Sequence, residues 1–154
     1  MDLNEYQNLA RHTAIYPGQG TITGLTYTIL GLVGEAGELS QTPTAKEKGD
    51  NFWFLAQACY ELELPLSYIN KPTKLEGTYF ETVALMAGQF SKVYRDNNLV
   101  LTPAKRQELI SFLTKIYNFL DNMPGSNSEA LKANIEKLFG RKERGTLTGD
   151  GEDR

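Results

Sequence analysis

The sequence is poor in the residues that build disulfides and histidine-based sites. It contains one cysteine, Cys59, and one histidine, His12, among 154 residues. A single cysteine excludes an internal disulfide and fits a reducing compartment. A single histidine gives no basis for a Ser-His-Asp triad and argues against the Glu-x-x-His di-iron bundles.

A strong positive charge and long apolar runs are also absent. The formal net charge is −3 and the pI about 5.2, so there is no general electrostatic case for nucleic-acid binding. No apolar run approaches the length of a membrane span. The first residues, "MDLNEYQNLAR", lack the basic start and apolar block of a signal peptide. We therefore expect a cytoplasmic protein that binds neither nucleic acid nor a membrane.

The chain is divided by proline and glycine into segments with helical periodicity. No segment alternates as a strand does, and "GQG" (18–20) lacks the ending of a phosphate-binding P-loop. We expect one all-α domain, residues 1–154, folded as a helical bundle. The last residues, "GTLTGDGEDR" (145–154), are expected to form a polar tail. The expected helices are about 3–15, 25–40, 44–63, 76–96, 103–122 and 127–144.

Four carboxylates are concentrated in "GEAGELSQTPTAKEKGD" (34–50). Glu35 and Glu38 are three residues apart, as are Glu47 and Asp50, so each pair lies on one face of its helix. The short connection makes the two helices antiparallel neighbours, and the four carboxylates can then converge in the groove between them. Without a cation they would repel one another. Oxygen ligands without histidine or cysteine suit Mg²⁺ or Mn²⁺, which predicts a metal site on the 25–63 helix pair.

An isolated Glu-x-x-Glu pair is usually only a solvated helix face. Here two such pairs flank one short turn, inside otherwise apolar helices. Glycine also recurs at Gly31, Gly34 and Gly37, although each helical glycine costs about 1 kcal/mol relative to alanine. These glycines indicate a close approach of a backbone or a ligand along that face of the helix.

The same residues resemble a known signature. "LGLVGEAGELS" (30–40) followed by "KEKGDNFWFLA" (46–56) is similar to the signature of the MazG-like all-α nucleoside triphosphate pyrophosphohydrolases, which are related to the dimeric dUTPases. The resemblance extends to "ARHTAIYP" (10–17) and "NIEKLFGRKERGTLTGDGEDR" (134–154), which look like the ends of phage and bacterial members.

The resemblance implies an activity: hydrolysis of a (deoxy)nucleoside triphosphate to the monophosphate and pyrophosphate. It implies two or more Mg²⁺ or Mn²⁺ ions per site. One carboxylate, Glu38 in preference to Glu35, would orient or deprotonate the attacking water. Related phage enzymes act on dGTP, which makes dGTP the expected substrate, and a viral protein would work in its host's cytoplasm. Family members commonly build the site between two bundles, so a homo-oligomer, a dimer or a tetramer, is expected. By the resemblance, the metal ligands are Glu35, Glu38, Glu47 and Asp50.

Two features depart from the family pattern. Only eight residues (39–46) separate the two acidic pairs, fewer than the family usually has. The basic stretch of the form "AEKVKKxxRD" is missing after Leu39, and a similar stretch appears later, in "FSKVYRDNN" (90–98). These departures keep open an alternative from another class, a non-catalytic helical module that binds a nucleotide or a protein.

An internal comparison offers an explanation for the displaced basic stretch. "LVGEAGELS" (32–40) resembles "ALMAGQFS" (84–91), with Met86 in place of Glu35 and Gln89 in place of Glu38. Residues 76–122 could be a degenerate copy that lost its acids, or an insertion could have split one ordinary unit. A chance match between two amphipathic helices also remains open.

Other residues could contact a nucleotide. Four cations could hold the phosphates, although basic residues near a helix end are also common on solvated surfaces. Trp53 could stack on a base, but aromatic residues at helical spacing are more often core. Asn51 could bond to sugar or phosphate. The predicted phosphate-binding cations are Lys92, Arg95, Lys137 and Arg141, the last two in the basic helix that precedes the tail (127–154).

Overall fold

The computed structural model describes residues 1–96 and 98–154, and this part of the chain contains helices and no strand. The expected all-α fold is therefore confirmed. None of the described helices combines the length and apolar character that crossing a membrane requires. Asn97, in the basic stretch 90–98, lies outside the described residues. The elements are α1 (Leu3–Arg11), α2 (Ile22–Gln41), α3 (Ala45–Glu61), the 3-10 helix η1 (Leu66–Ile69), α4 (Tyr79–Asp96), α5 (Pro103–Asp121) and α6 (Asn127–Arg144).

The helix boundaries follow the local chemistry of their ends. Helix α1 was expected to reach about residue 15, but it ends at Arg11 because the Thr13 hydroxyl bonds back to the Ala10 carbonyl at 2.7 Å. Helix α3 begins where expected, since the Thr44 hydroxyl accepts a bond from the Glu47 N–H at 3.3 Å. Helix α4 begins three residues later than expected, after Gly77 adopts a φ of 69°.

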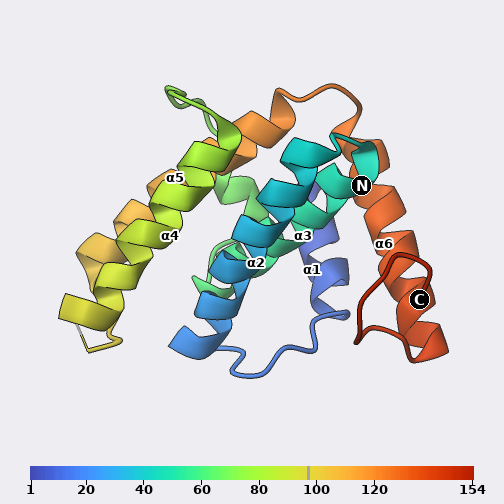
Figure 1. Ribbon diagram of the computed structural model, residues 1–154, viewed down its shortest axis with the longest axis horizontal. Helices are drawn as coiled ribbons and strands as arrows, with labels where there is room; N and C mark the ends of the chain where they lie inside the picture. Colours follow the sequence, from blue (N-terminus) through green and yellow to red (C-terminus); the bar gives the residue numbers. More distant parts are fainter. Residues whose placement is uncertain (97) are drawn as a thin grey trace.

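Helices α2 and α3 form the centre of the molecule (Figure 1). Helix α4 packs on α2 and α5 packs on α3, whereas α1 and α6 pack on α3 from the opposite flank. The Tyr94 and Thr26 hydroxyls lie 2.6 Å apart, and the Phe80 ring approaches Gly37. Helix α4 therefore runs antiparallel to α2, and its last turn lies beside the first turns of α2.

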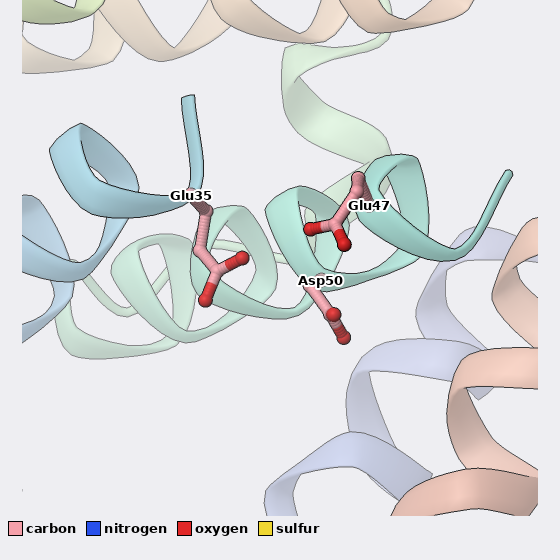
Figure 2. A group of neighbouring side chains, drawn as sticks. All are labelled: Glu35, Glu47 and Asp50. Atoms are coloured by element: carbon pink, nitrogen blue, oxygen red, sulfur yellow. The ribbon is translucent and has the colours of Figure 1, made fainter. Parts of the chain in front are cut away.

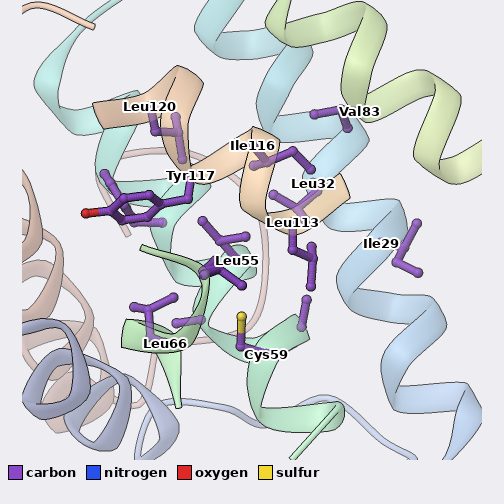
Figure 3. Close-up of a cluster of buried hydrophobic side chains, with 14 of the residues drawn as sticks. Ile29, Leu32, Leu55, Cys59, Leu66, Val83, Leu113, Ile116, Tyr117 and Leu120 are labelled. Atoms are coloured by element: carbon purple, nitrogen blue, oxygen red, sulfur yellow. The ribbon is translucent and has the colours of Figure 1, made fainter. Parts of the chain in front are cut away.

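The connection between α2 and α3 is short, Thr42–Thr44, and it makes the two helices antiparallel as expected. Their facing turns carry Glu35 from α2 and Glu47 and Asp50 from α3 (Figure 2). The apolar core runs along the buried faces of the pair and joins α2 and α3 to η1, α4 and α5 (Figure 3), and residues of α1 and α6 also belong to it. Cys59 is fully buried there, as expected for a small core residue.

Close helix packing requires glycine at two positions. A Cβ on Gly31 would lie 2.0 Å from the Phe54 ring, and one on Gly49 would lie 3.0 Å from the Ala130 carbonyl oxygen. Gly31 thus lets α3 approach α2, and Gly49 lets α6 approach α3. At Gly34 and Gly37 no protein backbone approaches in this way, because a Cβ at Gly34 meets no atom within 4 Å and one at Gly37 only touches Phe80, at 4.0 Å. The approach of a ligand along this face stays a prediction.

Residues 76–122 do form a second helix pair, α4 and α5, packed beside the first. Met86, which aligns with Glu35, is fully buried in the core, and Glu108 is paired with Lys105 at 3.1 Å. Within the described residues, this pair contains no group of metal-ligating side chains. The arrangement agrees with the expected absence of an acidic groove, while descent of the two pairs from one repeat stays a prediction.

Asn51 links three helices and is fully buried. Its amide group donates to the main-chain carbonyls of Glu35 and Glu47, at 3.0 and 2.8 Å. Its side-chain oxygen accepts a 2.7 Å bond from the Tyr79 hydroxyl of α4. The turns that carry two acidic side chains are therefore fixed relative to each other by one amide.

Replacing Tyr79 tests this link. Tyr79→Phe removes one hydroxyl and leaves the buried Asn51 oxygen without a donor, which typically costs about 1–3 kcal/mol. We expect the free energy of unfolding in urea to fall by that amount. Tyr117→Phe is the matched control, because Tyr117 is also buried but its hydroxyl makes no hydrogen bond in the described chain. Equal losses in both variants would contradict the proposed role of the link.

Candidate metal centre

Three carboxylates converge between α2 and α3. Glu35, Glu47 and Asp50 each offer an oxygen atom, and these oxygens lie within 4.8 Å of one another (Figure 2). The Oε2 atoms of Glu35 and Glu47 are buried and have no hydrogen-bond partner. Buried charged oxygens without partners are costly, and a bound cation is the simplest way to satisfy them.

The pKa values of the acidic residues reflect this crowding. Burial, followed by the charges of Asp50, Glu38 and Glu47, raises the pKa of Glu35 from 4.5 to about 8. Burial and the charges of Asp50 and Glu38 also raise the pKa of Glu47. Lys137 acts in the opposite direction on Glu35. The metal-free group thus favours a proton on Glu35 near neutral pH.

Asp50 is held from the side of α6. The Lys137 ammonium forms an ion pair with Asp50 Oδ1, and the Asn134 amide donates to the same oxygen at 3.0 Å. Asn134 is itself fixed by the Tyr6 hydroxyl of α1, which donates to its side-chain oxygen at 2.8 Å. Both bonds to Asp50 reach Oδ1, and no hydrogen bond in the described chain reaches Oδ2, which leaves that oxygen for a cation.

Glu38 does not belong to the group of three. It is exposed on α2, and its carboxylate is not among the oxygens that converge within 4.8 Å. Glu38 still lines the same cavity as Glu35 and Asp50, and its charge raises the pKa of Glu35. The structure therefore places Glu38 at the edge of the expected metal site.

A cavity of about 330 Å³ opens beside the acidic residues. Aromatic side chains form its wall on the side of α2, α3 and the 12–21 loop. The Tyr16 and Tyr27 rings stack with their centroids 4.6 Å apart, and Trp53 meets Phe54 edge-on at 4.9 Å. The Trp53 indole N–H donates to Thr13 at 2.9 Å. The cavity thus has an acidic end and an aromatic end.

The opposite wall comes from α6 and residues 147–154. This segment was expected to be a polar tail, but it folds back along α6 and lines the cavity with Leu147 and Gly149–Glu152. Arg141 is buried, with 5% of its surface exposed, and lies 3.6 Å from the Glu152 carboxylate. Lys46, at the start of α3, also pairs with Glu152. Lys137, Arg141 and Lys46 therefore place positive charge around the acidic end.

Two of the four predicted phosphate-binding cations lie elsewhere. Lys92 and Arg95 belong to the end of α4 that packs near Thr26, roughly 14 Å along α2 from Glu35. Arg95 makes a two-bond pair with its neighbour Asp96, at 2.6 and 2.8 Å. Neither residue lines the cavity, so a contribution of this stretch to the same cavity is not supported.

Asn51 is also placed differently from the expectation. It is 0% exposed, and both ends of its amide are bonded inside the protein, so it orders the ligand-bearing turns and does not face the cavity. Trp53, in contrast, is only partly buried and does line the cavity. The other two predicted cations, Lys137 and Arg141, lie beside the acidic residues as described.

Sequence reasoning missed several residues of this site. Lys46 directly precedes Glu47 in "KEKGD" (46–50). This position beside a predicted metal ligand could have indicated that Lys46 belongs to the site. Tyr6 and Asn134 are distant in sequence, and no local pattern indicates their contact. The wall-forming role of 147–154 had one signal, the resemblance of this segment to the ends of family members.

Comparison with known proteins gives one relative. The chain is 27% identical to the "Gene 37 protein" of Mycobacterium phage L5, over an alignment of 161 positions that covers all of both proteins. No family model matches the chain. No solved structure matches it either. The similarity thus extends over the full length of a phage protein.

The raised pKa of Glu35 predicts a pH-dependent stability. In EDTA, the folded protein keeps a proton that the unfolded chain releases above about pH 4.5, so the stability is lost as the pH rises toward about 8. Glu35→Gln removes this effect. The free energy of unfolding of Glu35→Gln, measured by urea denaturation, should exceed that of the parent. This difference should grow between about pH 4.5 and pH 8 and stay constant above pH 8.

With Mg²⁺ at pH 8, the parent should become more stable than Glu35→Gln, because the ion stabilises only a site that retains its carboxylates. Glu136→Gln, at an exposed position on α6, is the control for removing one negative charge. An advantage of Glu35→Gln that stays constant across the pH range would contradict the assignment.

Proposed function

We propose that this protein hydrolyses nucleoside triphosphates to the monophosphate and pyrophosphate, with Mg²⁺ or Mn²⁺ held between α2 and α3. The observation that carries the proposal is the pair of buried, unpartnered oxygens on Glu35 and Glu47, converging with Asp50 at the end of a cavity. The resemblance of residues 30–56 to the MazG-like signature supports the same activity.

The residues present fit a hard divalent cation. All the donors are carboxylate oxygens, the type that Mg²⁺ and Mn²⁺ prefer, and two of them lack any other partner. When bound, such ions supply charge neutralisation for phosphate oxygens and an activated water. Glu35, Glu47 and Asp50 would hold them, and Glu38 would complete the set of ligands at the cavity edge.

The protein's own groups divide the remaining work. Glu38 faces the cavity and is free of the central group, so it can orient or deprotonate a water near the α-phosphorus. Lys137 and Arg141 would bind phosphate oxygens from the α6 side. Loss of either would weaken triphosphate binding more than metal binding.

The aromatic end of the cavity suits a nucleobase. Tyr16, Tyr27 and Trp53 offer ring surfaces in the cavity that the carboxylates also line, and a base stacked on them would leave its phosphates beside Glu35 and Asp50. We retain dGTP as the proposed substrate on the strength of the resemblance. We also retain a homo-oligomer, for which exposed Leu30 and Leu85, on α2 and α4, supply apolar surface.

The activity is tested by following phosphorus products. The protein is incubated with each common ribo- and deoxyribonucleoside triphosphate and Mg²⁺ or Mn²⁺, and the products are identified by ³¹P NMR. We expect the monophosphate and pyrophosphate to appear together. Glu38→Gln and Asp50→Asn should reduce turnover at least about 100-fold, because one removes the general base and the other a metal ligand.

The helical fold of both variants should persist, as judged by circular dichroism, because neither change enlarges a buried side chain. Glu136→Gln again serves as the control and should turn over substrate like the parent. Orthophosphate and the diphosphate as first products would mean that the wrong bond has been assigned. Metal-dependent triphosphate binding without any product would favour the alternative, a non-catalytic nucleotide-binding module.

A further inference from the structure

Residues 145–154 are fixed against α6 by a set of specific bonds. Gly145, with a φ of 69°, ends α6, and the Thr146 N–H returns to the Arg141 carbonyl at 2.8 Å. The Arg154 guanidinium donates to the carbonyls of Thr146 and Gly151, at 3.1 and 2.8 Å. These bonds close the segment into a loop, which carries Glu152 to the cavity.

Glu152 is an anion placed among cations. Its carboxylate pairs with Lys46 and lies 3.6 Å from the Arg141 guanidinium, which also donates to the Glu152 main-chain oxygen at 3.2 Å. The side chain of Arg141 is only 6% exposed, whereas that of Glu152 is 53% exposed. Arg141 is thus the buried, fixed part of this contact, whereas the Lys46 side chain is 41% exposed. Glu152 is the part that can leave.

The contact lies between an acidic group and nearby cations, and the cations prevail, because the bond with Lys46 lowers the pKa of Glu152. Glu152 lines the same cavity as Glu35, Glu38 and Asp50, and its charge raises the pKa of Glu47. An additional negative charge beside an acidic group is tolerated only where positive charge outweighs it locally. Lys46 and Arg141 provide that balance. A phosphate group carries more negative charge than a carboxylate and would gain more from the same two cations.

We propose that Lys46 and Arg141 form a phosphate subsite that Glu152 occupies in the ligand-free protein, so that the segment 145–154 competes with the substrate. The role in substrate binding rests on the proposed function, whereas the competition between Glu152 and a phosphate does not. The subsite takes a phosphate of a polyphosphate chain, and the Glu152 carboxylate leaves when that phosphate arrives.

The test measures binding of imidodiphosphate, a pyrophosphate analogue, by isothermal titration calorimetry in Mg²⁺. Glu152→Gln removes the competing charge and should tighten binding about two- to fivefold, the range expected for a half-exposed ion pair of this kind. Asp153→Asn is the matched control. It removes the same charge one residue away, at an exposed position that makes none of these ion pairs in the described chain, and it should bind like the parent.

A double-mutant cycle identifies the cation involved. Lys46→Met should weaken binding of the analogue. Adding Glu152→Gln to Lys46→Met should give a smaller gain than Glu152→Gln gives in the parent, because only Arg141 is then freed. Glu152→Ala repeats the comparison with a second side chain, and thermal unfolding verifies that each variant is folded. The proposal is overturned if Glu152→Gln binds like the parent, or if Asp153→Asn gains as much as Glu152→Gln.

The outcome is independent of catalysis. If Glu152→Gln tightens binding of the analogue while no triphosphate is hydrolysed by the parent, the subsite stands and the proposed activity fails. If triphosphates are hydrolysed while Glu152→Gln leaves binding of the analogue unchanged, the activity stands and the competition is wrong.

Discussion

The concentration of carboxylates between α2 and α3 is the constraint on which the rest of the structure depends. Two short segments that face each other across one turn bring Glu35, Glu47 and Asp50 together, with two of their oxygens buried and unpartnered. The surrounding protein responds by placing rigid support behind them, through the Asn51 amide and Tyr79, and positive charge beside them, through α6. The chain tolerates this local cost because α2 and α3 are buried on their other faces by apolar packing.

Much of this could be predicted from the sequence, because the features involved are local. The helical period, the caps and the short turn are properties of neighbouring residues, and together they bring Glu35, Glu47 and Asp50 to one groove. Glu38 shows the limit of the same reasoning. Residues three apart on a helix are offset by about 60°, so a pair that shares a broad face need not reach the same point. Here Glu35 turns inward and Glu38 stays at the edge.

The parts that could not be predicted depend on long-range packing. The placement of Lys92 and Arg95 follows from the direction of α4 against α2, which no local pattern specifies. Asn51 was expected to contact a nucleotide because it is polar. In the structure it is buried, since α4 packs over it and Tyr79 bonds to its side-chain oxygen. The segment 145–154 has the glycine and polar composition typical of mobile chain ends. Here it is held by bonds between residues that are close only after the turn at Gly145, so composition alone did not indicate its position along α6.

Trp53 has a consequence for how this protein can be observed. It is the only tryptophan in the chain, it forms part of the cavity wall, and its indole N–H is bonded to Thr13 rather than to solvent. Excitation at wavelengths that only tryptophan absorbs therefore gives fluorescence from one known position. Any ligand that stacks in the aromatic end changes the emission of that single fluorophore, without a label and without a background from other indoles.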